Sequence, residues 1–312
     1  MNAANMNSSE ITTIVNGSLI DAVSVRDRGL QYGDGFFTTM LVTGDQLLNW
    51  PGHWRRVQQA ESRLQFPAMD ELELFTQVKQ AIAVFNYTKS TIESNKVVKI
   101  IFTRGVGGVG YQIPEKPLIS TILQVALAPI QIEREAETNL PMFAQPQAIE
   151  IGLCETLCGI QPQLAGLKHL NRLENVLARS EIAHKGLPEG IMLNAYQQAI
   201  GGTQSNLFLI KGHRLITPQL TDSGVEGTTR YQLSQLAGSL DLVWQEANLL
   251  ITDLMQADEL FLANAVRGIM PVNLFNQKRY PTIKTFEIHQ AWSTWQRENA
   301  VSLSLEIERA AL

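Results

Sequence analysis

Two hydrophobic repeats alternate along the first half of the chain and predict its secondary structure. Short runs rich in apolar and β-branched residues are typical of strands, and stretches with apolar residues three or four positions apart are typical of helices. The predicted strands cover 12–17, 36–44, 97–105 and 118–129, and the predicted helices cover 53–64 and 72–85. Strands that bracket helices in this way predict an α+β unit.

A polar stretch at 133–147 has no periodicity and predicts a connection to a second half. Beyond it, short strands and helices mix without a long sequence repeat. We expect strands at 149–157, 190–195, 206–212 and 214–218, with helices after Lys168, after Gly227 and near Thr252. From about Thr285 a terminal helix carries Trp292 and Trp295, which are expected to pack on the rest of the protein.

The segment 166–179 combines helical periodicity with a lysine at its start. Its apolar residues predict a buried helical stripe made of Leu170, Leu173, Val176 and Leu177. This stripe places Lys168 at the mouth, that is the N-terminal start, of the predicted helix. A lysine amine attacks a carbonyl when its pKa is lowered and its position is fixed. From the residues alone, a solvated lysine at a helix start is the favoured interpretation.

Composition and charge restrict the classes of function. The net charge of −5 argues against a nucleic-acid surface, and no basic stripe is visible. The first ten residues are polar, and no run of eighteen apolar residues is present, so we expect a cytoplasmic protein that does not contact a membrane. The chain has two cysteines, Cys154 and Cys158, which are too few for a disulfide framework or a zinc site. We predict reduced packing residues and no metal.

A glycine-rich stretch imitates a dinucleotide-binding motif. Gly105, Gly107 and Gly110 satisfy the G-x-G-x-x-G spacing after a predicted strand. That motif requires a helix to follow, whereas Pro114 and Pro117 break any helix there and another strand comes next. We therefore predict a hairpin loop.

Five blocks in order resemble one enzyme family. KHLNRLENVLAR, EGIMLN, SNLFLIKGHRLITP, GVEGTTR and ADELFLANAVRGIMPV, within about 14–275, are similar to the aminodeoxychorismate lyases. These belong, with branched-chain and D-amino-acid transaminases, to the fold-type IV pyridoxal phosphate enzymes. The resemblance implies an α+β fold of two domains, a small α/β sandwich and a larger barrel-like domain with the cofactor between them, and a homodimer.

The resemblance also implies domain boundaries. We predict a disordered N-terminal extension at 1–13, a small domain at 14–128, a connection at 129–143, a larger cofactor-binding domain at 144–290, and a C-terminal helical extension at 291–312.

The matching blocks imply a role for each site residue. Lys168 is expected to form a Schiff base with pyridoxal 5′-phosphate and then to act as the base that moves the substrate proton. Arg56 is expected to pair with the phosphate, since its planar fork gives two charge-assisted bonds. The remaining implied contacts are the turn at Gly227 with the amides of Thr228 and Thr229 for the phosphate, and Asn264 and Ala265 for phosphate and substrate. Tyr111 matches a tyrosine in a loop over the substrate, although simple loop packing is equally compatible with its position.

Two positions depart from the family pattern. Gly201 stands where the family has a glutamate that contacts the pyridine nitrogen, and Val109 stands where the lyases often carry an arginine for a substrate carboxylate. We predict that Arg267, together with Arg104, replaces that lost charge. A solvent-facing Arg267 is the alternative.

The resemblance implies a reaction. The expected function is conversion of 4-amino-4-deoxychorismate to 4-aminobenzoate and pyruvate, a step of folate biosynthesis. One alternative is an aminotransferase of the same fold, acting on branched-chain or D-amino acids. Another is a non-catalytic homologue that binds a ligand, which Gly201 and Val109 keep open. Loss of the pyridine contact harms a transaminase more than an elimination driven by aromatisation, so it favours the lyase.

Overall fold

The computed structural model of the protein describes residues 11–89, 94–130, 132–134 and 141–303. Contacts between these residues define two compact units. The first contains the described residues up to Met142, Lys168–Asn171 and the described residues from Gln296, and the second contains 143–167 and 172–295. The N-terminal extension is predicted at 1–13. Its residues 1–10 lie outside the part of the chain that the structure describes, and the first strand begins at Thr12.

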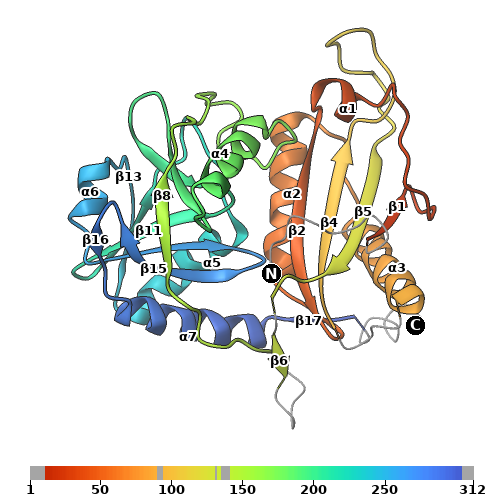
Figure 1. Ribbon diagram of the computed structural model, residues 1–312. Helices are drawn as coiled ribbons and strands as arrows, with labels where there is room; N and C mark the ends of the chain where they lie inside the picture. The colour runs from red at the N-terminus through yellow and green to blue at the C-terminus, as the bar shows by residue number, and fades with distance from the viewer. Residues whose placement is uncertain (1–10, 90–93, 131, 135–140, 304–312) are drawn as a thin grey trace. The chain divides into compact units, whose positions relative to one another are not determined.

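The first unit is built on a six-stranded antiparallel sheet with the strand order β1-β5-β4-β2-β3-β17 (Figure 1). Its strands are β1 (Thr12–Val15), β2 (Gly35–Thr43), β3 (Gln46–Leu47), β4 (Asn95–Thr103), β5 (Ser120–Leu127) and β17 (Val301–Ser302). Its helices are α1 (Arg28–Tyr32), α2 (Trp50–Leu64) and α3 (Glu71–Lys89), and a short pair of strands follows, β6 (Glu133–Arg134) and β7 (Pro141–Met142). The predicted strands and helices of this half are all present.

The two faces of this sheet differ in what covers them. Successive side chains of a strand point to opposite faces, so alternate residues share a face. Phe36, Thr38 and Met40 of β2 are buried on the face that α2 contacts. Phe37 is half-buried on the opposite face. Lys99 of β4 lies on the same face as Phe37, because it pairs with Thr39, two residues after Phe37 in β2. That second face therefore carries polar and aromatic groups within partial reach of solvent.

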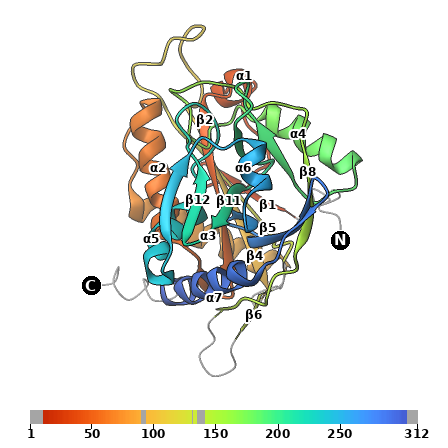
Figure 2. The same cartoon turned by 90° about the vertical axis from the view of Figure 1, so that its left-hand side faces the viewer.

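The second unit is a nine-stranded sheet that curls into a half-barrel (Figure 2). Its path is β10-β9-β8-β15-β14-β11-β12-β13, with β16 on β15. The strands are β8 (Ile149–Leu153), β9 (Gly190–Leu193), β10 (Ala199–Gly202), β11 (Asn206–Lys211), β12 (Arg214–Pro218), β13 (Val243–Ala247), β14 (Glu259–Asn264), β15 (Gly268–Phe275) and β16 (Lys278–Arg279). The helices are α4 (Leu173–His184), α5 (Thr228–Leu236), the 3-10 helix η3 (Ala237–Leu240), α6 (Ile251–Met255) and α7 (Ile283–Glu298).

Hydrophobic clusters cover both faces of the half-barrel. Leu207 and Leu209 of β11 point to one cluster, which Leu254 of α6 completes. Phe208 of β11 points to the other, with Trp292 of α7. Because β11 is buried on both sides, its sequence is apolar without alternation. The ring of Trp292 also donates from Nε1 to Gln232 Oε1 at 2.9 Å, so the terminal helix packs as expected.

The buried stripe predicted for the helix after Lys168 is wrong. Leu173, Val176 and Leu177 are exposed, Leu173 by 70% of its surface. The helix α4 instead buries Ala178 and Ile182 against β8 and β9. Two strand glycines, at 152 and 190, explain the choice, because a Cβ at either position would crowd the Ile182 side chain. Helical periodicity was correct here, but the buried face was not.

Three further predictions are confirmed. Cys154 and Cys158 are free, buried packing residues, and burial raises the pKa of each thiol to about 12. The glycine-rich stretch is a loop between the antiparallel strands β4 and β5, with no helix after it. The predicted α+β fold of two domains is also confirmed. No helix in the described part of the chain is long and apolar enough to cross a membrane.

Candidate active site

Lys168 is fixed by main-chain bonds to the edge of the first sheet. The Phe37 N–H donates to the Lys168 carbonyl at 3.0 Å, and the Leu170 N–H donates to the Gly35 carbonyl at 3.0 Å. Lys168 therefore lies in an extended segment, and not at the mouth of α4 as predicted, since that helix begins five residues later. Its side chain is half-buried, with Nζ 4.5 Å from the centre of the Phe37 ring. The backbone at Lys168 is thus fixed, and its amine lies over the Phe37 ring.

Lys99 is a candidate site residue that the sequence reasoning missed. Its Nζ lies 5.1 Å from the centre of the same Phe37 ring that Lys168 contacts. Burial lowers the pKa of Lys99. It forms no ion pair with any other described residue, although a partly desolvated cation gains from an anionic partner. The signal was available in the sequence, since a lysine interrupts the apolar strand VVKIIF.

Arg56 is held on the other side of β2 with two polar neighbours. Its Nη1 donates to the Thr38 hydroxyl at 3.3 Å, and that hydroxyl lies 2.6 Å from His53 Nδ1. The helix α2 brings His53 and Arg56 to one face because they are three residues apart. Burial, and then the positive charges of Arg56 and Lys168, hold the pKa of His53 well below its usual value. The charges of Arg56 and Lys168 therefore both act on one histidine.

The N-terminus of α5 in the second unit presents groups suited to a phosphate. Gly227 is its N-cap in extended conformation and supplies no side-chain cap. A side chain there would overlap Asn206, whose Nδ2 donates to the Val225 carbonyl at 2.8 Å and holds the turn. The hydroxyls of Thr228 and Thr229 are buried and accept or donate no hydrogen bond among the described residues. Unpaired N–H and hydroxyl donors at a helix N-terminus favour a dianion.

The loop between β14 and β15 carries the other predicted residues of this unit. Asn264 Oδ1 accepts from the N–H groups of Val266 at 3.0 Å and Arg267 at 2.7 Å, and Asn264 Nδ2 donates to the Gln204 carbonyl at 3.3 Å. The Asn264 side chain is thus used within the protein, which leaves main-chain groups there, including those of Ala265, for a ligand. Arg267 is exposed and forms no ion pair with another described residue.

The backbone around Gly201 leaves little room for a larger residue, and the described carboxylate beside it already has partners. A Cβ on Gly201 would lie 2.9 Å from the Ser205 carbonyl oxygen, so a larger residue needs a shift of the backbone. Glu189 is the buried carboxylate beside this turn, because it directly precedes β9, the strand that pairs with β10. Its oxygens accept from the N–H groups of Gly190, Thr203 and Gln204 and from the hydroxyls of Thr203 and Ser205. Glu189 is therefore occupied in holding the turn after β10.

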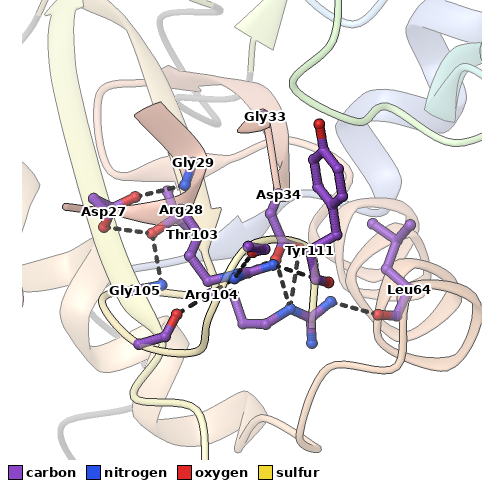
Figure 3. Close-up of polar contacts among 12 residues, drawn as sticks. Asp27, Arg28, Gly29, Gly33, Asp34, Leu64, Thr103, Arg104, Gly105 and Tyr111 are labelled. Carbon is purple, nitrogen blue, oxygen red and sulfur yellow. Dashed lines mark hydrogen bonds and ion pairs between the residues drawn. The ribbon is translucent and has the colours of Figure 1, made fainter. Parts of the chain in front are cut away.

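Arg104 is a structural residue and is not available to a substrate (Figure 3). Only 2% of its surface is exposed. Its Nε donates to both Asp34 carboxylate oxygens at 3.0 and 2.9 Å, and its two Nη groups donate to the carbonyls of Gln65 at 2.9 Å and Leu64 at 2.7 Å. The guanidinium also covers the Phe66 ring at 4.2 Å. We therefore leave Arg104 out of the candidate substrate site.

A second arginine on Asp34 holds the glycine-rich loop that carries Tyr111 (Figure 3). Arg28 Nε donates to Asp34 at 2.8 Å, and the Arg28 Nη groups donate to the carbonyls of Gly107, Gly110 and Tyr111 at 3.3, 3.0 and 3.4 Å. The Tyr111 ring is exposed by 87% and meets the Tyr32 ring edge-on at 5.4 Å. The loop is thus held in one conformation with Tyr111 projecting from it.

The family model described as "Amino-transferase class IV" matches residues 35–275, which include Lys168, Arg56 and the α5 N-terminus. The chain belongs to the class IV aminotransferase family. The aminodeoxychorismate lyase of Vibrio harveyi is 33% identical over 261 residues, which cover 83% of this chain and 89% of that protein. A solved 4-amino-4-deoxychorismate lyase from Pseudomonas aeruginosa is 32% identical with a TM-score of 0.76, over 92% of this chain and 98% of that one.

Aminotransferases of the family are also similar to this chain. A D-alanine aminotransferase of Listeria monocytogenes is 25% identical over 288 residues, which cover 89% of this chain and 93% of that protein. The sequence resemblance to the fold-type IV enzymes is therefore confirmed. Both lyases and aminotransferases of this fold use pyridoxal phosphate.

The residues of this chain fit that cofactor. A half-buried lysine in a fixed position suits its aldehyde, and a buried arginine suits its phosphate. The two buried hydroxyls at the α5 N-terminus, Thr228 and Thr229, have no protein partner and suit the phosphate as well. Position 201 departs from the family pattern, because glycine stands where the family has the glutamate that contacts the pyridine nitrogen.

Proposed function

We propose that the protein is a pyridoxal phosphate-dependent lyase that converts 4-amino-4-deoxychorismate to 4-aminobenzoate and pyruvate, a step of folate biosynthesis. The observation that carries the proposal is the fixed, half-buried Lys168 amine beside a ring that a second lysine, Lys99, also contacts. The 33% identity to the Vibrio harveyi lyase over most of both chains supports the same reaction.

Three groups hold the cofactor in this proposal. Lys168 binds its aldehyde, Arg56 binds its phosphate, and the amides and hydroxyls of Thr228 and Thr229 bind the phosphate with them. When bound, pyridoxal phosphate supplies an electron sink for the substrate carbon that bears the amino group. The main-chain bonds of Lys168 to β2 fix the backbone from which its amine reaches the substrate for the later proton transfer.

Lys168 then acts as the base. Its amine removes the proton from the amino-bearing ring carbon of the substrate, the ring carbon–oxygen bond to the enolpyruvyl group breaks, and the ring becomes aromatic. The protonated amine then returns that proton to the methylene carbon of the released enolpyruvate, which gives pyruvate. A neutral His53 close to Lys168 adds no further positive charge to the surroundings of this amine. Aromatisation drives the elimination, so the reaction depends little on reprotonation of the carbon.

The substrate carries two carboxylates, and Lys99 is the cation that the structure supports best for one of them. Its ammonium is partly desolvated, which strengthens a bond to a carboxylate, and it has no acidic partner among the described residues. Arg267, exposed and without an ion pair in the same described part, is proposed for the second carboxylate. Tyr111, on its braced loop, is proposed to cover the substrate.

The glycine at position 201 favours the lyase over a transaminase. A carboxylate on the pyridine nitrogen would contribute on the order of 2 kcal/mol to holding the nitrogen protonated. Its absence weakens the electron sink, and a transaminase, which must form and reprotonate the carbanion in both directions, depends more on that sink than an elimination does.

We also propose that the protein acts as a homodimer. Exposed apolar residues support it on α4, where Leu173, Val176 and Leu177 form a continuous stripe, and on the first unit, where Val109 and Tyr111 project from the loop. Patches of this kind mark association surfaces. Sedimentation velocity of the wild type and of Leu177→Glu tests this: a wild-type monomer at micromolar concentration would contradict it.

The reaction is tested by incubating purified protein, pyridoxal phosphate and 4-amino-4-deoxychorismate and measuring both products. The proposal predicts equal amounts of 4-aminobenzoate and pyruvate, none with Lys168→Ala, and unchanged yield with Lys211→Ala, a lysine at the end of β11. Amino transfer to a keto acid without release of pyruvate would support the aminotransferase instead. No turnover of either kind by a protein that binds pyridoxal phosphate would support a non-catalytic homologue.

A further inference from the structure

Three polar side chains are buried together between β2 and α2, beside residues of the hydrophobic core. Thr38, His53 and Arg56 are each at most 9% exposed. The Thr38 hydroxyl lies between the other two, 2.6 Å from His53 Nδ1 and 3.3 Å from Arg56 Nη1. Phe36 and Met40, the neighbours of Thr38 on the same face of β2, belong to the hydrophobic core. Polar groups in such a place are costly unless they are paired with each other.

The chemistry of these groups fixes the direction of each hydrogen bond. A guanidinium can only donate, so the Thr38 oxygen accepts from Arg56. The Thr38 hydroxyl proton is buried, and His53 Nδ1 is its one possible acceptor among the hydrogen-bond partners of Thr38 in the described residues, so the proton would otherwise be unsatisfied. Nδ1 must then accept, which requires a neutral imidazole with its proton on Nε2. The environment agrees, because burial and the two nearby cations hold the pKa of His53 well below its usual value.

This directed chain has a consequence for Arg56. An arginine side chain has many rotamers, and ordering it at the moment of ligand binding reduces affinity. A hydroxyl whose proton is committed to His53 presents its lone pair to Arg56 and restrains the guanidinium group before a ligand arrives. The protein, and not the ligand, then sets the orientation of the guanidinium edge that does not contact Thr38.

We propose that Thr38 and His53 are positioning residues that orient Arg56 for the phosphate group of the cofactor. The proposal rests on the proposed function, because it needs Arg56 to bind that phosphate. Neither residue touches the cofactor in this account. Their effect is therefore confined to ligands that carry the phosphate, and a merely structural role would affect phosphorylated and unphosphorylated ligands alike.

The test compares two ligands on the full-length protein. Dissociation constants for pyridoxal 5′-phosphate and for pyridoxal, which lacks the phosphate, are measured by absorbance titration for the wild type, Thr38→Val and Thr38→Ser. Valine has the shape of threonine without the hydroxyl. We expect Thr38→Val to weaken pyridoxal phosphate binding about tenfold and pyridoxal binding less than about twofold, with serine restoring the wild-type ratio.

The chain offers a matched control on the same strand. Thr43 of β2 is also fully buried, and its hydroxyl has no hydrogen-bond partner among the described residues. Thr43→Val makes the same chemical change five residues away and should leave both dissociation constants unchanged. His53→Leu, which removes the acceptor, is expected to lower the preference for the phosphorylated ligand as Thr38→Val does, and it provides a second variant should Thr38→Val not fold.

The possible outcomes separate the two proposals. A wild type that does not bind pyridoxal phosphate refutes the proposed function, and the positioning role with it. A wild type that binds pyridoxal phosphate, with a Thr38→Val variant that has the wild-type ratio or loses both ligands equally, overturns the positioning role alone. Selective loss of the phosphorylated ligand in Thr38→Val and His53→Leu, with Thr43→Val unaffected, supports it.

Discussion

Replacing Asp34 by alanine should destabilise the protein strongly and release the loop that carries Tyr111. The Asp34 carboxylate is the shared partner of Arg28 and Arg104, whose side chains are 4% and 2% exposed. Alanine removes the acceptor of both Nε groups and leaves two buried guanidinium groups without their counter-charge. Arg28, which donates to the carbonyls of Gly107 and Gly110 in the loop, then loses the Asp34 contact that orients its side chain.

The structure allows the cost to be estimated. Charge-assisted hydrogen bonds contribute about 1.5 to 3 kcal/mol each, and Asp34 accepts from two guanidinium groups at 2.8 to 3.0 Å. Removing one partner of a buried ion pair costs about 3 to 5 kcal/mol in other proteins. We therefore expect Asp34→Ala to lose about 3 to 5 kcal/mol of unfolding free energy and Asp34→Asn, which keeps an acceptor oxygen, roughly half as much.

Urea unfolding followed by tryptophan fluorescence measures this loss, and limited proteolysis reports on the loop between β4 and β5. Asp21→Ala is the control, because Asp21 is an exposed aspartate without an ion pair among the described residues, and it should change the unfolding free energy by less than about 0.5 kcal/mol. If Asp34→Ala lost less than about 1 kcal/mol and the loop stayed resistant to protease, the bracing role assigned to Asp34 would be refuted.

Three further predictions follow from other parts of the molecule. Gly190→Ala should cost about 1 to 3 kcal/mol of unfolding free energy, because the new Cβ overlaps Ile182, and Ile182→Val should recover part of the loss in the double variant. Lys99→Ala should lower kcat/KM for 4-amino-4-deoxychorismate by about 10- to 100-fold, mainly through KM; an unchanged KM removes Lys99 from the substrate site. Because the pKa of His53 is lowered in the folded protein, the unfolded chain takes up a proton on this residue below about pH 6.5, whereas the folded protein does so only at lower pH. The contribution of His53 to the free energy of unfolding therefore decreases as the pH falls below about 6.5. Unfolding free energies at about pH 7 and 5.5 should thus differ less in His53→Asn than in the wild type, and equal differences would show that His53 titrates normally.

Local patterns in the sequence were sufficient for much of the fold. Alternation predicted β2 and β4, and helical spacing predicted α2, because each element buries one face whose residues are close in sequence. The glycine-rich loop followed from Pro114 and Pro117, whose effect on a helix is also local. The motif blocks gave the family because their order is specific even where each block is not.

Long-range partners decided what the sequence could not give. Helical spacing showed that α4 is amphipathic, but the buried face was selected by strand glycines such as Gly190, which lie outside the helix. The sequence places Arg104 close to the loop that is predicted to cover the substrate, so Arg104 was expected to bind a substrate carboxylate. Only the fold brings Asp34, which lies 70 residues earlier, into contact with Arg104. Thr38 and His53 gave no signal separately, since the relation between them exists only once β2 packs on α2.

The most direct test of the central claim is to identify the lysine that binds pyridoxal phosphate. The protein is incubated with the cofactor, reduced with borohydride, digested, and mapped by mass spectrometry. The account predicts one phosphopyridoxyl group, on the peptide that contains Lys168, and none on that peptide after Lys168→Ala. Labelling of other lysines with Lys168 unmodified, or no stable labelling of the wild type, would contradict it.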